Sequence, residues 1–468
     1  MTDLGLFGDE RLQRGPSFWG RGSPSARPVF AGSAEIEPGA WPIGAFLHNA
    51  SATCDDRLGA AARHAAEAAR GRHVLAIQDT TELNFSGHVG SKRGFGVVGN
   101  GRDIGLFLHP AIVAEAGDGD PRQVGHAGGI VGLADADIYS RKKAPPGGRK
   151  SREKQRRVPR PIEAKDTGRR VRGLCEADRL LSEAAMVTVV SDCESDIYEI
   201  FAAPRSAHVH LLVRAEHNRV LSDGGKLFST MAALPHVEGQ EIVISAKDGR
   251  PARKARTRVS WQEIEAPRPR VGFEVERLPP TVKLNAVRVE EIDPPAGVKP
   301  IVWLLLTTHP VETLEDALRI VGWRRARWTI EQVFRVMKSQ GFDLWDSQIE
   351  TPEAMAKLAL AVLIAALRTM QLVNARSGTT GQKLADAMDE AAEPLVEILT
   401  QKLEGKTLKL KNPHPTGTLA RLAWVVGRLG GWDGYVGRGY KPPGPITIAR
   451  GLIRFDAIRE GWRLRQDV

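Results

Sequence analysis

Uninterrupted runs of apolar and often β-branched residues recur along the chain, and two of them end in an aspartate. Runs of this length without polar alternation are typical of strands that are buried on both faces of a sheet. We expect such strands at residues 73–79, 106–113, 129–134, 186–192, 208–214 and 301–308. Asp79 and Asp192 close the first and the fourth of these runs, so each carboxylate is predicted to lie at the end of a buried strand.

Helical patterns at residues 55–69 and 163–185 accompany these strands. Three consecutive strands followed by helix, strand, helix and strand predict an α/β fold, with a mixed sheet flanked by helices. A helix between parallel strands also fits the right-handed crossover rule. Between about residues 220 and 300, Pro and Gly separate short β-branched segments, which predicts a β-rich insertion. These segments are residues 242–244, 257–261 and 287–290.

A capping-box pattern, Thr313 with Asp316, predicts the start of a long helix that runs to about Gln340. At about 100° per residue, one narrow stripe of this helix carries the carboxylate Glu331 among basic side chains. The basic residues of the stripe are Arg324, Arg327, Arg335 and Lys338. A carboxylate beside cations that bind phosphate suits a DNA-cutting site. The alternative is a solvated helix face, with ion pairs worth about 0.2–0.5 kcal/mol each.

The pattern after residue 351 is mostly helical up to Gly430. Its longest apolar run, Leu358–Leu367, is too short for a bilayer that needs about 20 residues, so we expect a buried core helix and no membrane partner. The chain starts without a signal-peptide pattern, and its three separated cysteines indicate neither a disulfide framework nor a zinc site. These features predict a cytoplasmic protein.

Composition adds an expectation about partners. The chain has 468 residues, a formal net charge of +10 and 42% apolar residues. The apolar content excludes wholesale disorder, and the length indicates roughly three domains. The charge favours an anionic partner, and the alternative is an ordinary basic protein with an arginine-rich composition. Residues 141–172 hold 14 Lys and Arg against three acidic residues, which predicts either a phosphate-binding arm or a solvated linker.

The strand-end aspartates are the first candidates for chemistry. Carboxylates at strand ends can converge at one edge of a sheet, where ligands bind in open α/β folds. Carboxylate oxygens are the ligands that Mg²⁺ prefers, and two such ions about 3.5–4 Å apart can drive the displacement of a phosphodiester oxygen. Asp79 and Asp192 could instead cap turns, which is a common role for aspartate.

Three segments, residues 75–83, 190–198 and 327–334, carry an Asp, Asp, Glu order and resemble the insertion-sequence-four family of bacterial DDE transposases. Shorter segments resemble the same family in the same order. They are Gly99–Gly101 followed by Leu108–Pro110, then Trp303–Thr308 and Arg428–Trp432. The resemblance covers the chain from about residue 73 to its end, and it implies a ribonuclease-H-like fold.

By this resemblance, Asp79, Asp192 and Glu331 are the catalytic ligands of two Mg²⁺ ions, for which Mn²⁺ can substitute. The resemblance also implies a set of DNA-binding residues. They are Trp303, Arg324, Arg327, Lys338 and Arg214. Arg324 stands where the family has a tyrosine, which is a departure from its pattern. Trp303 would stack on a flipped base, and a core tryptophan in a buried strand is the alternative.

The implied activity is cut-and-paste transposition, which comprises cleavage at transposon ends, hairpin formation and strand transfer. The implied partners are double-stranded DNA, as terminal inverted repeats and as target, and a second copy of the chain. The expected domains are an irregular DNA-end-binding region at 1–70, a catalytic domain at 71–385 and a helical dimerisation domain at 386–468. Two alternatives are an inactive or inhibitory DNA-binding relative and a ribonuclease-H-like nuclease without strand transfer.

Overall fold

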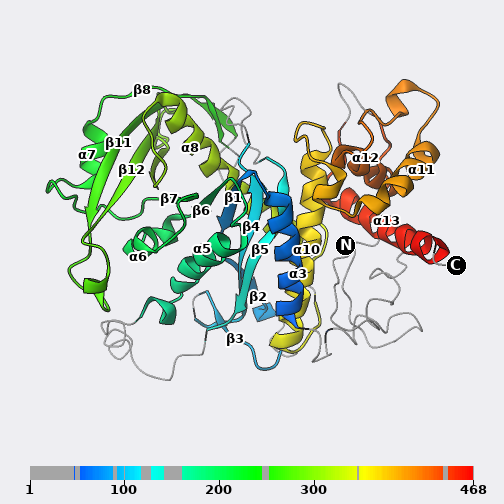
Figure 1. Ribbon diagram of the computed structural model, residues 1–468, viewed down its shortest axis with the longest axis horizontal. Helices are drawn as coiled ribbons and strands as arrows, with labels where there is room; N and C mark the ends of the chain where they lie inside the picture. Colours follow the sequence, from blue (N-terminus) through cyan, green and yellow to red (C-terminus); the bar gives the residue numbers. More distant parts are fainter. Residues whose placement is uncertain are drawn as a thin grey trace.

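A mixed sheet flanked by helices organises the computed structural model of this chain (Figure 1). The structure describes residues 47, 53–87, 92–99, 101–117, 128–141, 161–244, 252–344, 347–435 and 441–466. Most of the predicted DNA-end-binding region and most of the basic tract at 141–172 lie outside the described residues.

The described residues form an 11-stranded sheet with the order β2-β4-β1-β6-β7-β13-β12-β11-β8, in which β3 and β5 also pair with β4. Its strands are β1 (His73–Gln78), β2 (Thr81–Asn84), β3 (Gly96–Val98), β4 (Asp103–Glu115), β5 (Ile130–Tyr139), β6 (Met186–Ser191), β7 (Val209–Arg214), β8 (Val237–Glu238), β11 (Thr257–Pro267), β12 (Thr281–Glu291) and β13 (Val302–Thr307). A separate two-stranded sheet pairs β9 (Ile242–Ile244) with β10 (Arg253–Ala255).

Three parallel strands lie at the centre of this sheet. β1 runs parallel to β6, and β6 runs parallel to β7, whereas β4 and β13 pair with them in the antiparallel direction. The register aligns Ile77 with Val190. Continuing this register by two residues along both strands brings Asp79 opposite Asp192. The two predicted carboxylates therefore leave the sheet at one edge.

Both faces of the sheet are buried, because successive side chains of a strand point to opposite faces. In β1, Leu75 and Ile77 join one apolar core, and Val74 and Ala76 join the other. The second core is covered by α5 (Gly168–Leu180), α6 (Tyr198–Ala202) and α7 (Leu227–Ala233). The first is covered by α8 (Leu314–Ala326), α9 (Trp328–Lys338) and α10 (Pro352–Ala375). Burial on both faces explains why these strands read as continuous apolar runs.

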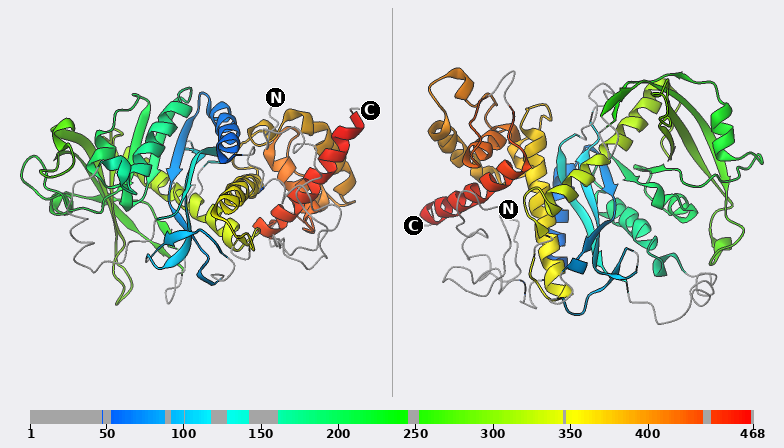
Figure 2. Two further views of the ribbon diagram at one scale, coloured as in Figure 1. Left: turned by 90° about the horizontal axis from the view of Figure 1, so that it is seen from below. Right: turned by 180° about the vertical axis from the view of Figure 1, so that it is seen from behind.

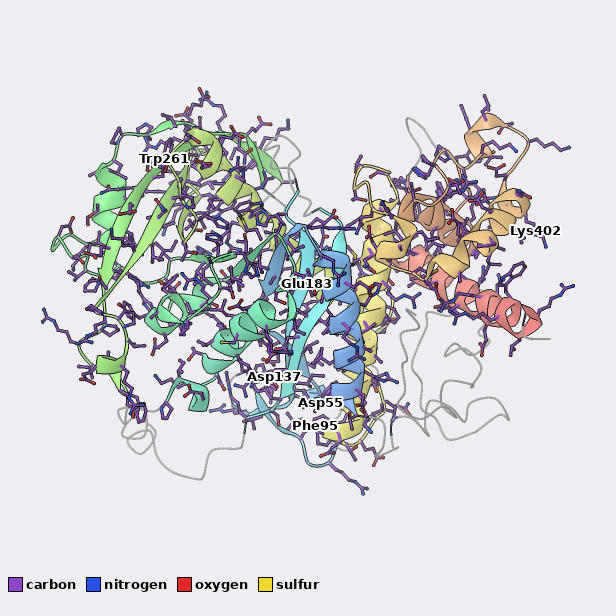
Figure 3. The ribbon with its side chains drawn as sticks, in the orientation of Figure 1. Asp55, Phe95, Asp137, Glu183, Trp261 and Lys402 are labelled. Atoms are coloured by element: carbon purple, nitrogen blue, oxygen red, sulfur yellow. The ribbon has the colours of Figure 1, made fainter. Side chains whose placement is uncertain are left out.

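The long helix α10 separates the sheet from a C-terminal group of helices (Figure 1, Figure 2). That group contains α11 (Glu393–Leu403), α12 (Leu419–Leu429) and α13 (Pro445–Gln466), whereas α3 (Cys54–Ala69) packs against β5 beside α10. Figure 3 shows Trp261 of β11 and Lys402 of α11 at opposite ends of the molecule. Short 3-10 helices complete the fold: η2 (Ile162–Ala164), η3 (Cys193–Ser195), η4 (Val275–Arg277), η6 (Leu384–Asp386), η7 (Glu390–Ala392) and η8 (Leu408–Leu410).

Helix α10 contains the longest apolar run of the chain. By length and composition alone it could cross a membrane, but 72% of its most apolar window is buried inside the protein. It packs against α9, β5, α12 and α13. It is therefore the core helix that the sequence predicts.

Three predicted elements differ from the structure. The helix expected at 163–185 is only α5, preceded by η2. The helix expected to run from Thr313 to Gln340 is broken at Arg327, whose backbone N–H bonds to the carbonyl of Arg325 instead of continuing the α-helical pattern. The β-rich stretch at 220–300 is largely part of the central sheet, because β12 pairs with β13 and β11 pairs with β12.

Candidate active site

Two carboxylates emerge side by side where the parallel strands β1 and β6 end. Asp79 Oδ1 accepts a hydrogen bond from the backbone N–H of Thr80 at 2.8 Å. Asp192 Oδ1 accepts the equivalent bond from Cys193, also at 2.8 Å. Each aspartate is thus held by the first turn after its strand, and a second oxygen remains directed away from that turn. The structure therefore brings Asp79 and Asp192 together, as their positions at strand ends predict.

Glu331 reaches the same place from the first turn of α9. The predicted apolar face of this helix is buried in the core, through Ile330, Val333, Phe334 and Met337. Burying that face fixes the rotation of α9 and directs Glu331 toward the strand ends. Three carboxylates from three separate elements, far apart in the sequence, therefore share one edge of the sheet.

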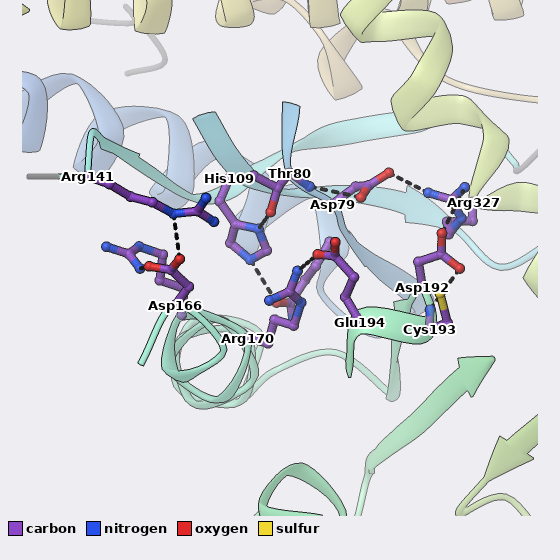
Figure 4. Close-up of polar contacts among 12 residues, drawn as sticks. Asp79, Thr80, His109, Arg141, Asp166, Arg170, Asp192, Cys193, Glu194 and Arg327 are labelled. Atoms are coloured by element: carbon purple, nitrogen blue, oxygen red, sulfur yellow. Dashed lines mark hydrogen bonds and ion pairs between the residues drawn. The ribbon is translucent and has the colours of Figure 1, made fainter. Parts of the chain in front are cut away.

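Arg327 contacts all three carboxylates, and Figure 4 shows it beside Asp79 and Asp192. Its Nη1 lies 2.5 Å from Asp79 Oδ2, and its Nη2 lies 3.2 Å from Glu331 Oε1 and 3.8 Å from Asp192 Oδ2. The Arg327 side chain is only 8% exposed. The i,i+4 ion pair of the alternative interpretation is thus present, with Arg327 buried and Glu331 36% exposed.

Arg324 provides a second counter-charge. Its Nη2 donates to Asp192 Oδ1 at 3.0 Å, and its side chain is 12% exposed. Arg214, at the end of β7, is half-buried, and its charge also acts on Asp192 and on Arg324. The residue that departs from the family pattern is thus an integral part of the carboxylate cluster in this structure.

Burial and charge act on the carboxylates in opposite directions. Burial raises the pKa of Asp79, and the nearby Glu331 adds to this rise, although Arg327 opposes it. Burial also acts to raise the pKa of Asp192, but Arg324, the Cys193 N–H and Arg327 together hold this pKa below its usual value. Burial, and then repulsion from Arg327, lowers the pKa of Arg324 to about 10. Asp192 is therefore the more strongly charge-stabilised of the two aspartates.

A polar group behind Asp79 was not predicted as part of the site. The Thr80 hydroxyl lies 2.8 Å from Nδ1 of His109 on β4, and His109 Nε2 lies 3.3 Å from Gln78 Oε1 (Figure 4). Burial lowers the pKa of His109 to about 3, so its imidazole is uncharged. His109 belongs to the Leu108–Pro110 segment that carries the resemblance, but nothing in the sequence shows that it supports Thr80.

The remaining predicted DNA-binding residues lie around this edge. Lys338 is half-buried at the end of α9, and the charges of Glu331 and Glu82 act on it. Trp303 is half-buried at the start of β13, opposite Val289, and packs against both the main core and the small core of β9 and β10. The structure thus leaves both interpretations of Trp303, base stacking and core packing, as predictions.

The donor set fits a hard divalent cation, because it consists of carboxylate oxygens that converge on one positive charge. Asp79, Asp192 and Glu331 are the residues that would hold the ion. Within the described ranges, however, no three His, Cys, Asp or Glu side chains are grouped so that they could hold a metal ion. In this arrangement the Arg327 guanidinium lies among the carboxylates, in contact with an oxygen of each.

Residues 172–368 match a family model described as the transposase DDE domain. This segment contains Asp192, Arg324, Arg327 and Glu331, and the structure adds Asp79 to them from outside it. The cryo-EM structure of a piggyBac transposase synaptic complex with hairpin DNA is also similar, at 10% sequence identity and a TM-score of 0.33. The likeness covers 76% of this chain and 58% of that chain. The family match supports a DDE-type transposase.

Proposed function

We propose that this chain, with a DDE-type domain over residues 172–368, is a metal-dependent DNA transposase of the cut-and-paste type. One observation carries the proposal: Asp79, Asp192 and Glu331 converge on the same guanidinium from two strand ends and a helix. The three carboxylates would hold two Mg²⁺ ions, or Mn²⁺ in their place. When bound, such ions activate the attacking oxygen and stabilise the leaving one.

The basic residues would bind the phosphates on either side of the bond that is cut. Arg324, Arg327, Lys338 and Arg214 surround the carboxylates, and arginine forks match phosphate oxygens in geometry and charge. Trp303 would stack on a base displaced from the duplex, a contact typically worth about 1–3 kcal/mol. These residues would hold the DNA end in place through hydrolysis, hairpin formation and transfer to target DNA.

The order of the central strands supports a ribonuclease-H-like catalytic domain, here assigned to residues 71–385. The parallel strands β1, β6 and β7, with the antiparallel β4 beside β1, suit that assignment, as do α5 before β6 and α6 between β6 and β7. The C-terminal helices at 386–468 would form the contact between two copies of the chain, each copy bound to one inverted repeat. Relatedness to the insertion-sequence-four family and a cytoplasmic location are parts of the same proposal.

A cleavage assay on DNA that carries the element's own ends tests the proposal. We expect the full chain to cut these ends in Mg²⁺ and not in chelator, and Asp192→Ala and Glu331→Ala to be inactive. The matched control is Glu183→Gln, because Glu183 is an exposed carboxylate paired with Arg70 far from the site. End binding without cutting would identify an inhibitory relative, and cutting without strand transfer would identify a nuclease. Cutting by either alanine variant would overturn the metal site.

A further inference from the structure

The carboxylate cluster has an internal set of cations. Arg327 contacts one oxygen each of Asp79, Asp192 and Glu331, and Arg324 occupies the other oxygen of Asp192. We call Arg324 and Arg327 the arginine pair. Every carboxylate of the proposed metal site is therefore already neutralised in part by a guanidinium of the same chain.

The arginine pair and a metal ion compete for the same oxygens. A Mg²⁺ ion requires oxygen ligands at about 2.0–2.1 Å in near-octahedral geometry, which leaves no room for a guanidinium on the same lone pairs. In the part of the chain that the structure describes, no three ligands are placed so that they could hold a metal ion. Binding of the ion therefore requires Arg327 to leave the space between the carboxylates.

The local structure of Arg327 suits such a movement. Arg327 lies at the junction where α8 ends and α9 begins, so its backbone is outside the regular hydrogen bonding of either helix. Its Nε is buried without a hydrogen-bond partner among the described residues. The two arginines also repel each other, since Arg327 contributes to the lowered pKa of Arg324. A displaced guanidinium would gain an anionic partner if a phosphate lay nearby.

We propose that the arginine pair closes the carboxylate site in the DNA-free chain and exchanges its carboxylates for DNA phosphates when metal binds. The inference rests on the proposed function and adds its regulation. The carboxylates then bind the metal in place of the guanidiniums, and the guanidiniums bind DNA phosphates in place of the carboxylates. Metal and DNA must then increase each other's affinity by the same factor, because coupling between two binding sites is reciprocal.

Titration of Mn²⁺ into the full chain without DNA, followed by electron paramagnetic resonance, tests this exchange. We expect Arg327→Gln to bind Mn²⁺ at least about tenfold tighter than wild type, which is about 1.4 kcal/mol, and Arg324→Gln to show a smaller gain. The matched control is Arg319→Gln, because Arg319 is on α8 and pairs with Glu315 and Asp316 outside the site. The control is expected to bind Mn²⁺ as wild type does.

A second titration in the presence of a short DNA duplex measures the coupling. Wild type is expected to bind Mn²⁺ more tightly with DNA, and Arg327→Gln is expected to lose most of this gain. The Asp192→Asn variant, with both arginines kept, is expected to lose Mn²⁺ binding, which shows that the signal comes from the carboxylate site. Unchanged or weaker Mn²⁺ binding by both glutamine variants would overturn the exchange. Absence of Mn²⁺ binding by wild type, with and without DNA, would instead overturn the proposed function. If Arg327→Gln does not fold, Arg327→Lys provides the test. The lysine ammonium is a single point charge without the planar fork by which Arg327 reaches Asp79 through Nη1 and Glu331 through Nη2, so this variant should also bind Mn²⁺ more tightly than wild type.

Discussion

The parallel strands bury polar groups toward both of their ends, and the two ends do so in opposite ways. Where β1 and β6 end, Asp79 and Asp192 are paired with arginines, whose charges oppose the effect of burial on the pKa of both carboxylates. Toward the start of the same strands lies a histidine cluster, which we define as His73, His210 and His309. Burial lowers the pKa of His73 to about 4 and of His309 to about 2, so these side chains are uncharged.

Among the described residues, neutral contacts hold the histidine cluster, and the charges of Arg319 and Arg205 act to lower the pKa of its members. The Thr188 hydroxyl lies 2.8 Å from Nε2 of both His73 and His309, so it can donate to one ring and accept from the other. His210 stacks on His309 at a ring distance of 4.0 Å, and Trp323 meets the edge of His73 at 4.8 Å. Because an uncharged imidazole needs no counter-charge, the histidine cluster can be buried without an acidic partner.

Helix α8 contacts both ends through successive residues. Trp323 packs on the histidine cluster, and Arg324 pairs with Asp192. A buried charge that is kept despite its desolvation cost is more informative about function than a buried group that becomes neutral. We therefore expect the chemistry to take place at the carboxylate end and the histidine cluster to have a supporting role.

The largest expected effect distinguishes the proposed metal ligands from the histidine cluster. Asp192→Asn and Glu331→Gln should each lower DNA cleavage at least about a thousandfold, because loss of a metal ligand removes several kcal/mol of transition-state stabilisation. His309→Asn should lower the melting temperature and leave cleavage within about tenfold at a temperature where it is folded. Cleavage rates and melting curves check this pair of outcomes. A dead but folded His309→Asn enzyme would contradict the division between the two ends.

A smaller effect is expected from the residues behind Asp79. Thr80→Val removes the hydroxyl that contacts His109 and leaves a buried imidazole nitrogen without that partner. Partners that orient a metal ligand typically contribute about 10–100-fold to metal affinity or activity, so we expect a loss in that range. Metal titration of the cleavage rate should show a raised metal requirement. An unchanged metal requirement would mean that the Thr80 hydroxyl does not help to orient Asp79, because the valine variant keeps the backbone N–H that donates to Asp79.

The histidine end predicts an acid instability. The folded pKa of His73 is about 4, below its ordinary value of 6.5. Between these values the unfolded chain binds a proton that the folded chain does not, so stability falls as the pH falls through this window. His73→Gln should therefore show a smaller loss of melting temperature between pH 6.5 and 4 than wild type, and His217→Gln, on an exposed loop, should match wild type. Equal losses in all three proteins would exclude His73 as a source of the instability.

The smallest effect concerns a basic residue at the border of the carboxylate end. Arg214→Ala should weaken DNA binding by a similar factor for all sequences and reduce the salt dependence of binding by about one phosphate contact. Fluorescence anisotropy at several salt concentrations measures this slope. A sequence-dependent loss with an unchanged slope would instead indicate that Arg214 contacts a base.

The strands could be predicted from the sequence because each depends on a local pattern, whereas the Asp, Asp, Glu assignment came from the resemblance to a transposase family. Asp79 and Asp192 close buried runs, and the apolar face of α9 fixes where Glu331 points. The pairing of β11 and β12 with the central sheet could not be predicted, since an apolar run does not specify its neighbour.

Contacts between residues that are distant in the sequence could not be predicted either. Arg324 pairs with Asp192 and Arg327 with Asp79 only after the chain has folded, and the helix break at Arg327 has no proline or glycine to mark it. The histidine cluster joins residues from β1, β7 and the loop after β13, none of which form a motif.

Iron-mediated cleavage of the polypeptide tests most directly whether the carboxylate end is the metal site. Fe²⁺ in place of Mg²⁺, with ascorbate and hydrogen peroxide, produces hydroxyl radicals that cut the backbone next to the bound ion. The account predicts cuts near Asp79, Asp192 and Glu331 in one protein sample, and their loss when excess Mg²⁺ is added. Cuts near His73, His210 and His309 instead, or cuts that Mg²⁺ does not suppress, would contradict it.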